Sequence, residues 1–105
     1  MNSFENKYDT IEKLIFDLEW VIKGVDFKKE INKMLISINT GHILALSLSD
    51  YPAFFNVSDE DLVNFQITAQ GTGVHWPALD EDLSLKGFLK DALVMMINDK
   101  AVKVA

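Results

Sequence analysis

The sequence predicts an α+β fold: a small antiparallel sheet of about four strands, with helices near both ends and one in the middle. The strongest observation is a hairpin, because residues 33–39 and 43–49 alternate apolar and polar side chains, the period of a half-buried strand. Asn39-Thr40-Gly41 supplies turn residues that tolerate positive φ. Segments 9–19 and 84–97 carry apolar side chains at helical spacing.

Each predicted helix begins with a side chain that can accept a backbone N–H bond in the first turn. Asp9, with Glu12 three residues later, forms a capping-box pattern for helix 9–19. Ser58 precedes three acids in helix 58–64, where the helix dipole favours negative charge. Ser84 takes the same place before helix 84–97, whose apolar side chains form one wide stripe in which Met95 and Met96 are expected to fill the core.

Two further strands complete the predicted sheet. Residues 20–27 are rich in β-branched and aromatic side chains, and residues 65–70 form a shorter run of the same kind. A chain of 105 residues with 49% hydrophobic content and no internal repeat predicts one domain over residues 1–105. The first residues lack a signal-peptide layout, and no apolar run approaches the roughly 20 residues that span a bilayer. We therefore expect a cytoplasmic protein without a membrane partner.

The charge pattern argues against a nucleic-acid partner. The net charge is −6, all ten basic residues other than histidine are lysines, and none lies between Lys33 and Lys86. Phosphate neutralisation needs a basic patch, and base reading relies on the arginine fork. An acidic surface can instead meet a basic protein, although it can also serve solubility alone.

The most specific segment of the chain is residues 71–82. Two glycines, a His-Trp-Pro corner and a cluster of acids fall in twelve positions, and the candidate interaction residues are Gly71, Gly73, His75, Trp76, Pro77, Asp80, Glu81 and Asp82. The Gly-x-Gly pair lacks the third glycine of a dinucleotide fingerprint, and Pro77 interrupts the helix that would face a phosphate. We expect this segment to form a loop joining the fourth strand to the last helix.

Residues 44–89, with Asp50-Tyr51-Pro52 and the motif above, resemble a family of small bacterial proteins known only as a domain of unknown function. The resemblance covers roughly residues 20–90, so helix 9–19 and the segment after residue 92 are expected to be additions. It implies a small α+β fold without established activity, often in toxin–antitoxin-like gene pairs. Pro52-Ala53-Phe54 departs from the family, which commonly has a basic residue and leucine after this proline.

His75, Asp80 and Asp82 allow an alternative interpretation as an acid–base or metal site of an enzyme or small-ligand binder. The oxygen spacing of a hard-ion loop is absent, and the sequence has neither a cysteine nor a Gly-x-Ser-x-Gly nucleophile. We therefore predict no catalytic, metal or cofactor residues. Instead, His75 and Trp76 are expected to pack the loop, and Asp80 and Asp82 to accept backbone N–H bonds around a turn and the helix start.

The predicted function is a non-catalytic protein-binding module, the antitoxin-like or regulatory partner of a small bacterial protein. The apolar stripes of the two terminal helices also predict a homodimer. Its interface would use Leu14, Ile15, Leu18, Trp20, Leu93, Met96 and Ile97.

Overall fold

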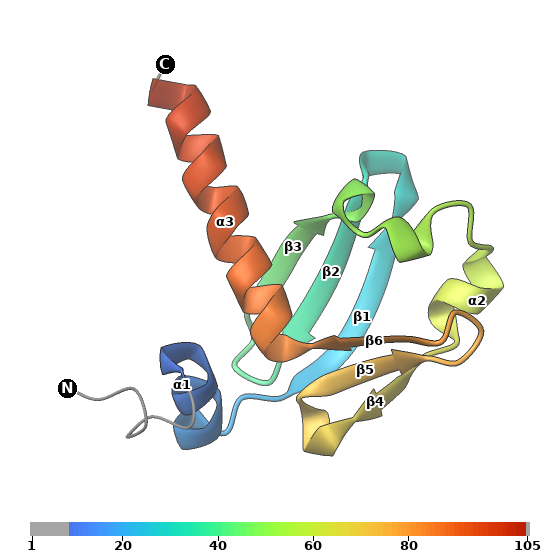
Figure 1. Ribbon diagram of the computed structural model, residues 1–105, viewed down its shortest axis with the longest axis horizontal. Helices are drawn as coiled ribbons and strands as arrows, with labels where there is room; N and C mark the ends of the chain where they lie inside the picture. Colours follow the sequence, from blue (N-terminus) through green and yellow to red (C-terminus); the bar gives the residue numbers. More distant parts are fainter. Residues whose placement is uncertain (1–8, 105) are drawn as a thin grey trace.

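The computed structural model describes residues 9–104, and the side chains of residues 9–98. The helices and strands follow one another along the chain as shown in Figure 1. They are α1 Thr10–Leu18, β1 Ile22–Lys28, β2 Lys33–Ile38, β3 Ile43–Ser47, α2 Asp59–Val63, β4 Gln66–Thr68, β5 Gly73–Trp76, β6 Glu81–Ser84 and α3 Leu85–Val104. The predicted α+β class is confirmed. The part of the predicted domain that covers residues 1–8 lies outside the described residues.

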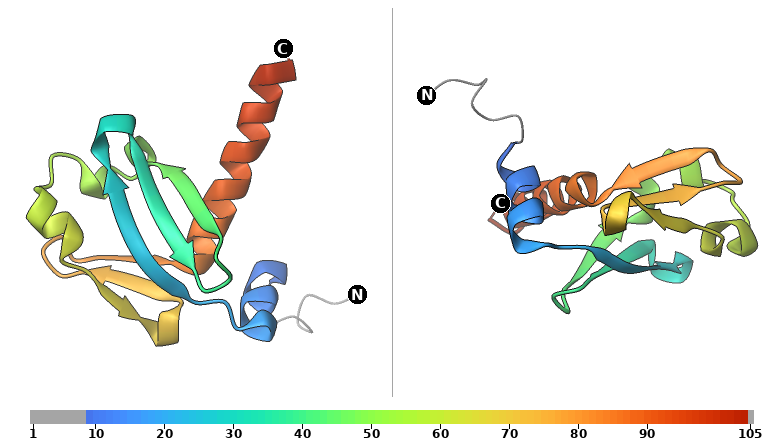
Figure 2. Two further views of the ribbon diagram at one scale, coloured as in Figure 1. Left: turned by 180° about the vertical axis from the view of Figure 1, so that it is seen from behind. Right: turned by 90° about the horizontal axis from the view of Figure 1, so that it is seen from below.

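The strands form two antiparallel sheets, so the prediction of a single four-stranded sheet is wrong. One sheet has the order β1-β2-β3 and the other β4-β5-β6. The fourth predicted strand does not join the first three, because β4 pairs with β5. The motif segment, predicted to be a loop, supplies the two strands β5 and β6 that complete the second sheet. Figure 2 shows the two sheets as separate layers when the molecule is seen from below.

The hairpin of β2 and β3 is confirmed with its predicted alternation. Met34 lies opposite Leu46 and Ile36 opposite Leu44, so these apolar side chains share one face. Gly41 has φ +92° in the turn, a conformation that glycine adopts without steric cost. The face that carries Met34 and Ile36 is buried, as the sequence period requires.

The hydrophobic core draws on both sheets and on α3. The fully buried side chains are Met34, Ile36 and Leu46 from the first sheet, Val74 and Trp76 from the second, Leu85 and Phe88 from α3, and Leu62 from α2. A shared core of this kind fixes the second sheet and α2 against the first sheet. The segment after β3 joins this core through Phe54, which is also buried.

Helix α3 starts at the core and then runs past it. Figure 1 shows its first turns beside β3 and its later turns projecting beyond the sheet. Leu85 and Phe88 are buried, whereas Leu93 and Ile97 are exposed and Met96 is 65% exposed. The placement of Met96 in the core is therefore wrong, because the apolar pattern continues along α3 beyond the surface that could cover it. Among the described residues, no helix has the length and apolar character needed to cross a membrane.

Helix α1 has the predicted capping box, and it is tied to the start of α3. The Asp9 carboxylate accepts the Glu12 backbone N–H at 2.8 Å, and the Glu12 carboxylate accepts the Asp9 N–H at 3.2 Å. The Lys86 ammonium lies 2.8 Å from Asp9 and 3.2 Å from Glu12. The hydrogen bond from Lys86, followed by that from Glu12, lowers the pKa of Asp9, and the same pairing raises the pKa of Lys86.

Removal of this lysine is expected to change the titration of Asp9. In Lys86→Met, the pKa of Asp9 should rise toward its ordinary value, because its largest hydrogen-bond donor is lost. Because the pKa of Asp9 is lower in the folded state, this pair stabilises the fold at pH values above the unfolded-state pKa. That stabilisation is lost as the pH falls through the folded-state pKa of Asp9. Carboxyl-detected NMR titration measures the change. An unchanged pKa in the variant would show that Lys86 does not contact Asp9 in solution.

Candidate functional site

The motif segment folds as the β5–β6 hairpin. In its antiparallel pairing, Gly73 lies opposite Ser84, His75 opposite Asp82 and Trp76 opposite Glu81. Since side chains alternate between the two faces of a strand, Trp76 points into the core and His75 to the outer face. The hairpin therefore separates the motif into an inner, structural set and an outer, accessible set.

Trp76 is the central inner residue of the motif. Its side chain has no exposed area, and its ring packs 4.8 Å from that of Phe54, centroid to centroid. The indole Nε1–H donates to the Leu62 backbone carbonyl at 3.0 Å. This bond joins the motif hairpin to the last turn of α2, so the tryptophan fixes the position of α2 relative to the hairpin.

The outer face of the hairpin pairs His75 with Asp82. Nδ1 of the imidazole lies 2.9 Å from Oδ1 of the carboxylate, and the Asp82 side chain is 75% exposed. The expectation that Asp82 accepts a backbone N–H near the helix start is wrong, because this residue lies on β6 and faces the imidazole. Ser84 takes the predicted capping role instead, with its Oγ accepting the Gly87 N–H at 3.0 Å.

A tight turn connects β5 to β6. The Leu79 N–H donates to the Trp76 carbonyl at 3.2 Å, and the Asp80 N–H donates to the Pro77 carbonyl at 3.4 Å. Asp80 has φ +50°, a left-handed conformation that aspartate tolerates better than most residues. Among the described residues, the Asp80 carboxylate accepts none of the side-chain hydrogen bonds found, so its predicted role as an acceptor is not supported.

Two glycines of the motif allow close approach of the backbone. Gly71 has φ +98°, and a Cβ at this position would lie 2.5 Å from the Val21 Cβ, so glycine lets the β4–β5 turn pack against the start of β1. A Cβ on Gly73 would lie 2.7 Å from the Thr68 hydroxyl. Both glycines are explained by packing rather than by phosphate binding.

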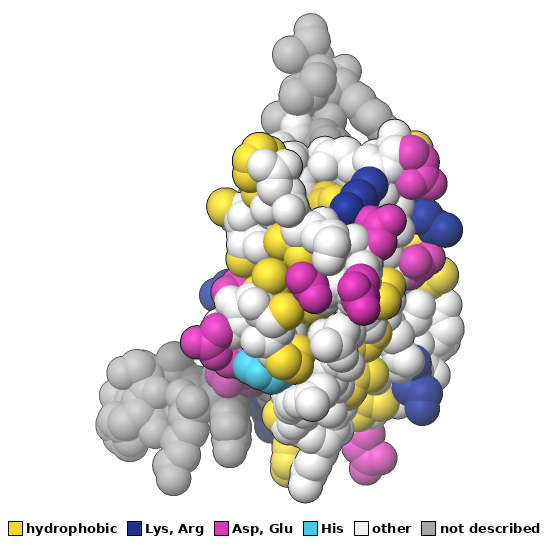
Figure 3. Space-filling model, turned by 90° about the vertical axis from the view of Figure 1, so that its right-hand side faces the viewer, with side chains coloured by type: hydrophobic (Ala, Val, Ile, Leu, Met, Phe, Trp, Pro, Cys, Tyr) yellow, Lys and Arg dark blue, Asp and Glu magenta, His cyan; other side chains and the backbone are white. Residues whose placement is uncertain are grey.

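Helix α2 lies beside the β5–β6 turn, as Figures 1 and 2 show. We define the acidic face as the surface around this end of the hairpin, with Glu60, Asp61, Asp80, Glu81 and Asp82. Strand register puts Glu81 on the side of Trp76 and Asp82 on the side of His75. The predicted cap of α2 is confirmed, because the Ser58 Oγ accepts the Asp61 N–H at 3.2 Å. Figure 3 shows acidic side chains spread over this side of the molecule with apolar side chains between them.

Within the part of the chain that the structure describes, no lysine forms an ion pair with a member of the acidic face. The neighbouring Asp59 differs, since Lys29 lies 2.7 Å from its carboxylate and also donates to the Val57 carbonyl. The acids of this face other than Asp82, which pairs with His75, therefore keep their charge available to a partner.

Tyr51 and Asp91 form a contact that the sequence did not predict. The Tyr51 hydroxyl donates to the Asp91 carboxylate at 2.5 Å, across 40 positions of the chain. Burial, the hydrogen bond to Asp91 and the charge of this carboxylate raise the pKa of Tyr51, which keeps the hydroxyl protonated. In the sequence, the family-like segment Asp50-Tyr51-Pro52 was the one signal for this region. No sequence pattern indicates that Tyr51 contacts α3.

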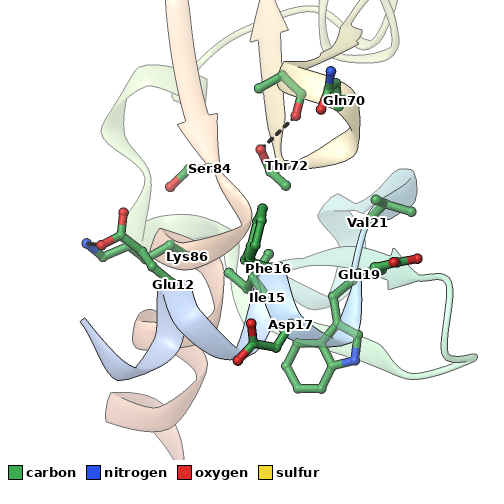
Figure 4. A pocket seen from close by; sticks show the side chains of 12 residues that line it. Glu12, Ile15, Phe16, Asp17, Glu19, Val21, Gln70, Thr72, Ser84 and Lys86 are labelled. Carbon is green, nitrogen blue, oxygen red and sulfur yellow. Dashed lines mark hydrogen bonds and ion pairs between the residues drawn. The ribbon is translucent and has the colours of Figure 1, made fainter. Parts of the chain in front are cut away.

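Two cavities border the motif. One, of about 740 Å³, lies between α1, the start of β1 and the β4–β5 turn. Figure 4 shows the Phe16 side chain pointing toward Thr72, while Lys86 at the rim is paired with Glu12. The other cavity, of about 410 Å³, lies between the second sheet (β4, β5 and β6) and the first turns of α3. The second cavity includes the motif residues Gly73 and Asp82 in its wall.

The metal alternative required His75, Asp80 and Asp82 to converge. The structure brings His75 and Asp82 together and leaves Asp80 in the turn. Within the described part of the chain, no three His, Cys, Asp or Glu side chains are grouped so that they could hold a metal ion.

Comparison with known proteins agrees with this architecture. Residues 22–93 match a family described as "Protein of unknown function (DUF2442)". The chain belongs to this family. Its matched region begins with β1 and ends within α3, so α1 and the later turns of α3 lie outside it. No curated protein matches the chain.

Two solved structures resemble the chain. A protein of unknown function from Rhodospirillum rubrum is 25% identical with a TM-score of 0.58, and the match covers 68% of this chain and 86% of that protein. An uncharacterised protein from Chromobacterium violaceum is 24% identical with a TM-score of 0.63, covering 88% of this chain and 84% of that one. The second likeness shows the fold alone, and neither relative has an assigned activity.

Proposed function

We propose that this DUF2442 protein is a non-catalytic protein-binding module that uses the acidic face to recognise a basic partner. The observation that carries the proposal is the placement of α2 beside the β5–β6 turn by the Trp76–Leu62 hydrogen bond of 3.0 Å. Acids from two separate segments thereby gather around the β5–β6 turn. A fixed array of like charges favours a partner of opposite charge and speeds its encounter.

The resemblance to proteins found in toxin–antitoxin-like gene pairs suggests what kind of partner this is. We infer that the chain is the antitoxin-like or regulatory partner of a small bacterial protein, and that it acts in the cytoplasm. The partner would present lysine or arginine side chains to the acidic face. A nucleic acid does not fit, because it would meet the same negative charge.

Capture of partners by two charge-matched variants tests the proposal. Glu60→Gln/Glu81→Gln should lose the captured protein from a lysate of the source organism, whereas Asp17→Asn/Asp26→Asn should retain it. Both doubles remove two negative charges, and only the first pair lies on the acidic face. Equal capture by both variants, or capture that does not weaken with added salt, would contradict a charge-based interface.

The His75–Asp82 pair supports a second candidate, a small-ligand binder or enzyme. A carboxylate that holds one ring nitrogen of an imidazole leaves the other available as a base or ligand. Metal analysis of untagged protein separates the candidates. Stoichiometric metal that disappears in His75→Ala would favour this second function over a protein-binding role.

Self-association is expected from the exposed apolar side chains of α3. Leu93 is 50%, Met96 65% and Ile97 66% exposed, and Leu18 of α1 is 53% exposed. Pairing with a second copy would remove these side chains from water, and each Å² of apolar surface buried contributes about 25 cal/mol to the stability of the dimer. Light scattering at micromolar concentration should give twice the 11.9 kDa chain mass, and Met96→Glu should reduce it. A wild-type mass of one chain would refute the dimer.

A further inference from the structure

The cavity of about 410 Å³ beside the motif has the size of a small-ligand site, for which roughly 300–1,000 Å³ is usual. The polar side chains of its wall are two carboxylates and four hydroxyls, contributed by Asp82, Asp91, Tyr51, Thr68, Thr72 and Ser84. No lysine lines it. The polar groups of the cavity are thus mainly hydrogen-bond acceptors and negative charges, which a cationic donor would satisfy.

Both carboxylates are held in place by neighbouring side chains. Tyr51 donates to Oδ2 of Asp91 at 2.5 Å, and the His75 Nδ1 lies 2.9 Å from Oδ1 of Asp82. Each bond occupies one carboxylate oxygen, and the other oxygen can accept from a ligand. Among the described residues, no lysine pairs with either carboxylate. Fixed carboxylates reduce the entropy that binding a cation would cost.

Two glycines let hydroxyl groups approach the wall of the cavity. A Cβ on Gly73 would lie 2.7 Å from the Thr68 Oγ1, and one on Gly87 would lie 3.3 Å from the Ser84 Oγ. Larger residues at these positions would therefore displace the hydroxyls. Each hydroxyl oxygen has two lone pairs, so it can accept an N–H from a ligand in addition to its present contact.

These features select among cations. A metal ion is a poor fit, because the described residues contain no group of three suitable ligands. A lysine ammonium is a compact charge with three donors, whereas a guanidinium has five N–H donors spread over a planar fork. Carboxylates contributed by two different elements, β6 and α3, with hydroxyls in the same wall, match the larger fork.

We propose that this cavity is an anchor for one arginine side chain of the protein partner. The proposal rests on the proposed function, because it names the chemistry of the partner at the edge of the acidic face. Asp82 and Asp91 bind the guanidinium, and Tyr51 and His75 are positioning residues that orient these carboxylates. Asp82 of the motif would then serve recognition rather than folding.

Three blocked tripeptides, Gly-Arg-Gly, Gly-Lys-Gly and Gly-citrulline-Gly, test the anchor by titration into the ¹⁵N-labelled full chain. The arginine peptide should shift the backbone amides of Gly73, Ser84 and Gly87 saturably. Citrulline, which keeps the shape without the charge, should bind at least tenfold more weakly, and lysine should be intermediate. Asp82→Asn and Asp91→Asn should each weaken arginine binding at least tenfold. Asp26→Asn, which changes the charge on the other sheet, should not.

Arginine and citrulline peptides that bind equally, or an arginine peptide that shifts none of these amides, would overturn the anchor. Tyr51→Phe supplies a second readout. It should weaken binding of the arginine peptide and leave the ratio of the arginine and citrulline affinities unchanged. Failure of the anchor remains distinguishable from failure of the proposed function. If the peptides do not bind but capture of the partner still depends on Glu60 and Glu81, the anchor alone is refuted. If the arginine peptide binds but no partner is captured, the partner role alone is refuted.

Discussion

Trp76→Ala is expected to lower the free energy of unfolding by about 3–5 kcal/mol, the range for removal of a buried aromatic side chain. The ring has no exposed area, and its removal also leaves the Leu62 carbonyl without its 3.0 Å donor. This loss is a large part of the roughly 5–15 kcal/mol that stabilises a typical domain. Urea unfolding monitored by circular dichroism measures the change.

Phe55→Ala is the matched control, because it also removes an aromatic ring but one that is 79% exposed. It should stay within about 0.5 kcal/mol of the wild type, as surface substitutions usually do. Trp76→Phe keeps most of the apolar contact with Phe54 and should fall between the two. If Trp76→Ala unfolded at the same urea concentration as the wild type, the indole would be accessible in solution.

Gly71→Ala is expected to have the second large effect. The new Cβ would lie 2.5 Å from the Val21 Cβ, and the backbone has φ +98°. Overpacking costs about 1–3 kcal/mol, and a left-handed conformation adds roughly 1–2 kcal/mol for a residue with a Cβ. The melting temperature and the urea midpoint should both fall.

Gly24→Ala provides the control for this substitution, since a Cβ there meets nothing within 4 Å. This change should be neutral or slightly stabilising, because alanine restricts the unfolded chain. Equal destabilisation by both substitutions would mean that chain flexibility, rather than the contact with Val21, explains the motif glycine.

Local patterns predicted the elements that depend on local interactions. The alternation in residues 33–39 and 43–49 is longer than that of any other strand pair, and it gave β2 and β3 correctly. The caps at Asp9, Ser58 and Ser84 form within the first turn of each helix, so they are visible as short spacings. These signals need no knowledge of the tertiary fold.

The second sheet was missed because its strands have weak local signals. Strands β5 and β6 contain four residues each, and glycine, proline and acids surround them. Val74 and Trp76 do alternate with His75, but four positions are too few to distinguish a strand from a loop. The pairing of these strands depends on packing against core residues from other segments of the chain, which a local sequence pattern cannot reveal.

The candidate site was predicted in its composition but not in its geometry. The motif residues were identified, yet the His75–Asp82 pair follows from strand register and the Tyr51–Asp91 bond from the packing of α3. Similarly, the exposure of Met96 depends on where the sheet beneath α3 ends. Tertiary distances of this kind leave no periodic trace in the sequence.

The most direct test of the account compares stability and partner capture in Asp82→Asn. Its side chain is 75% exposed and pairs only with a partly exposed histidine, so the substitution should leave the melting temperature within about 2 °C, corresponding to the small contribution of a surface pair. Capture of the basic partner should nevertheless fall at least tenfold. Unchanged capture would show that the outer face of the motif does not recognise a partner. A large fall in melting temperature would show that Asp82 serves the fold instead.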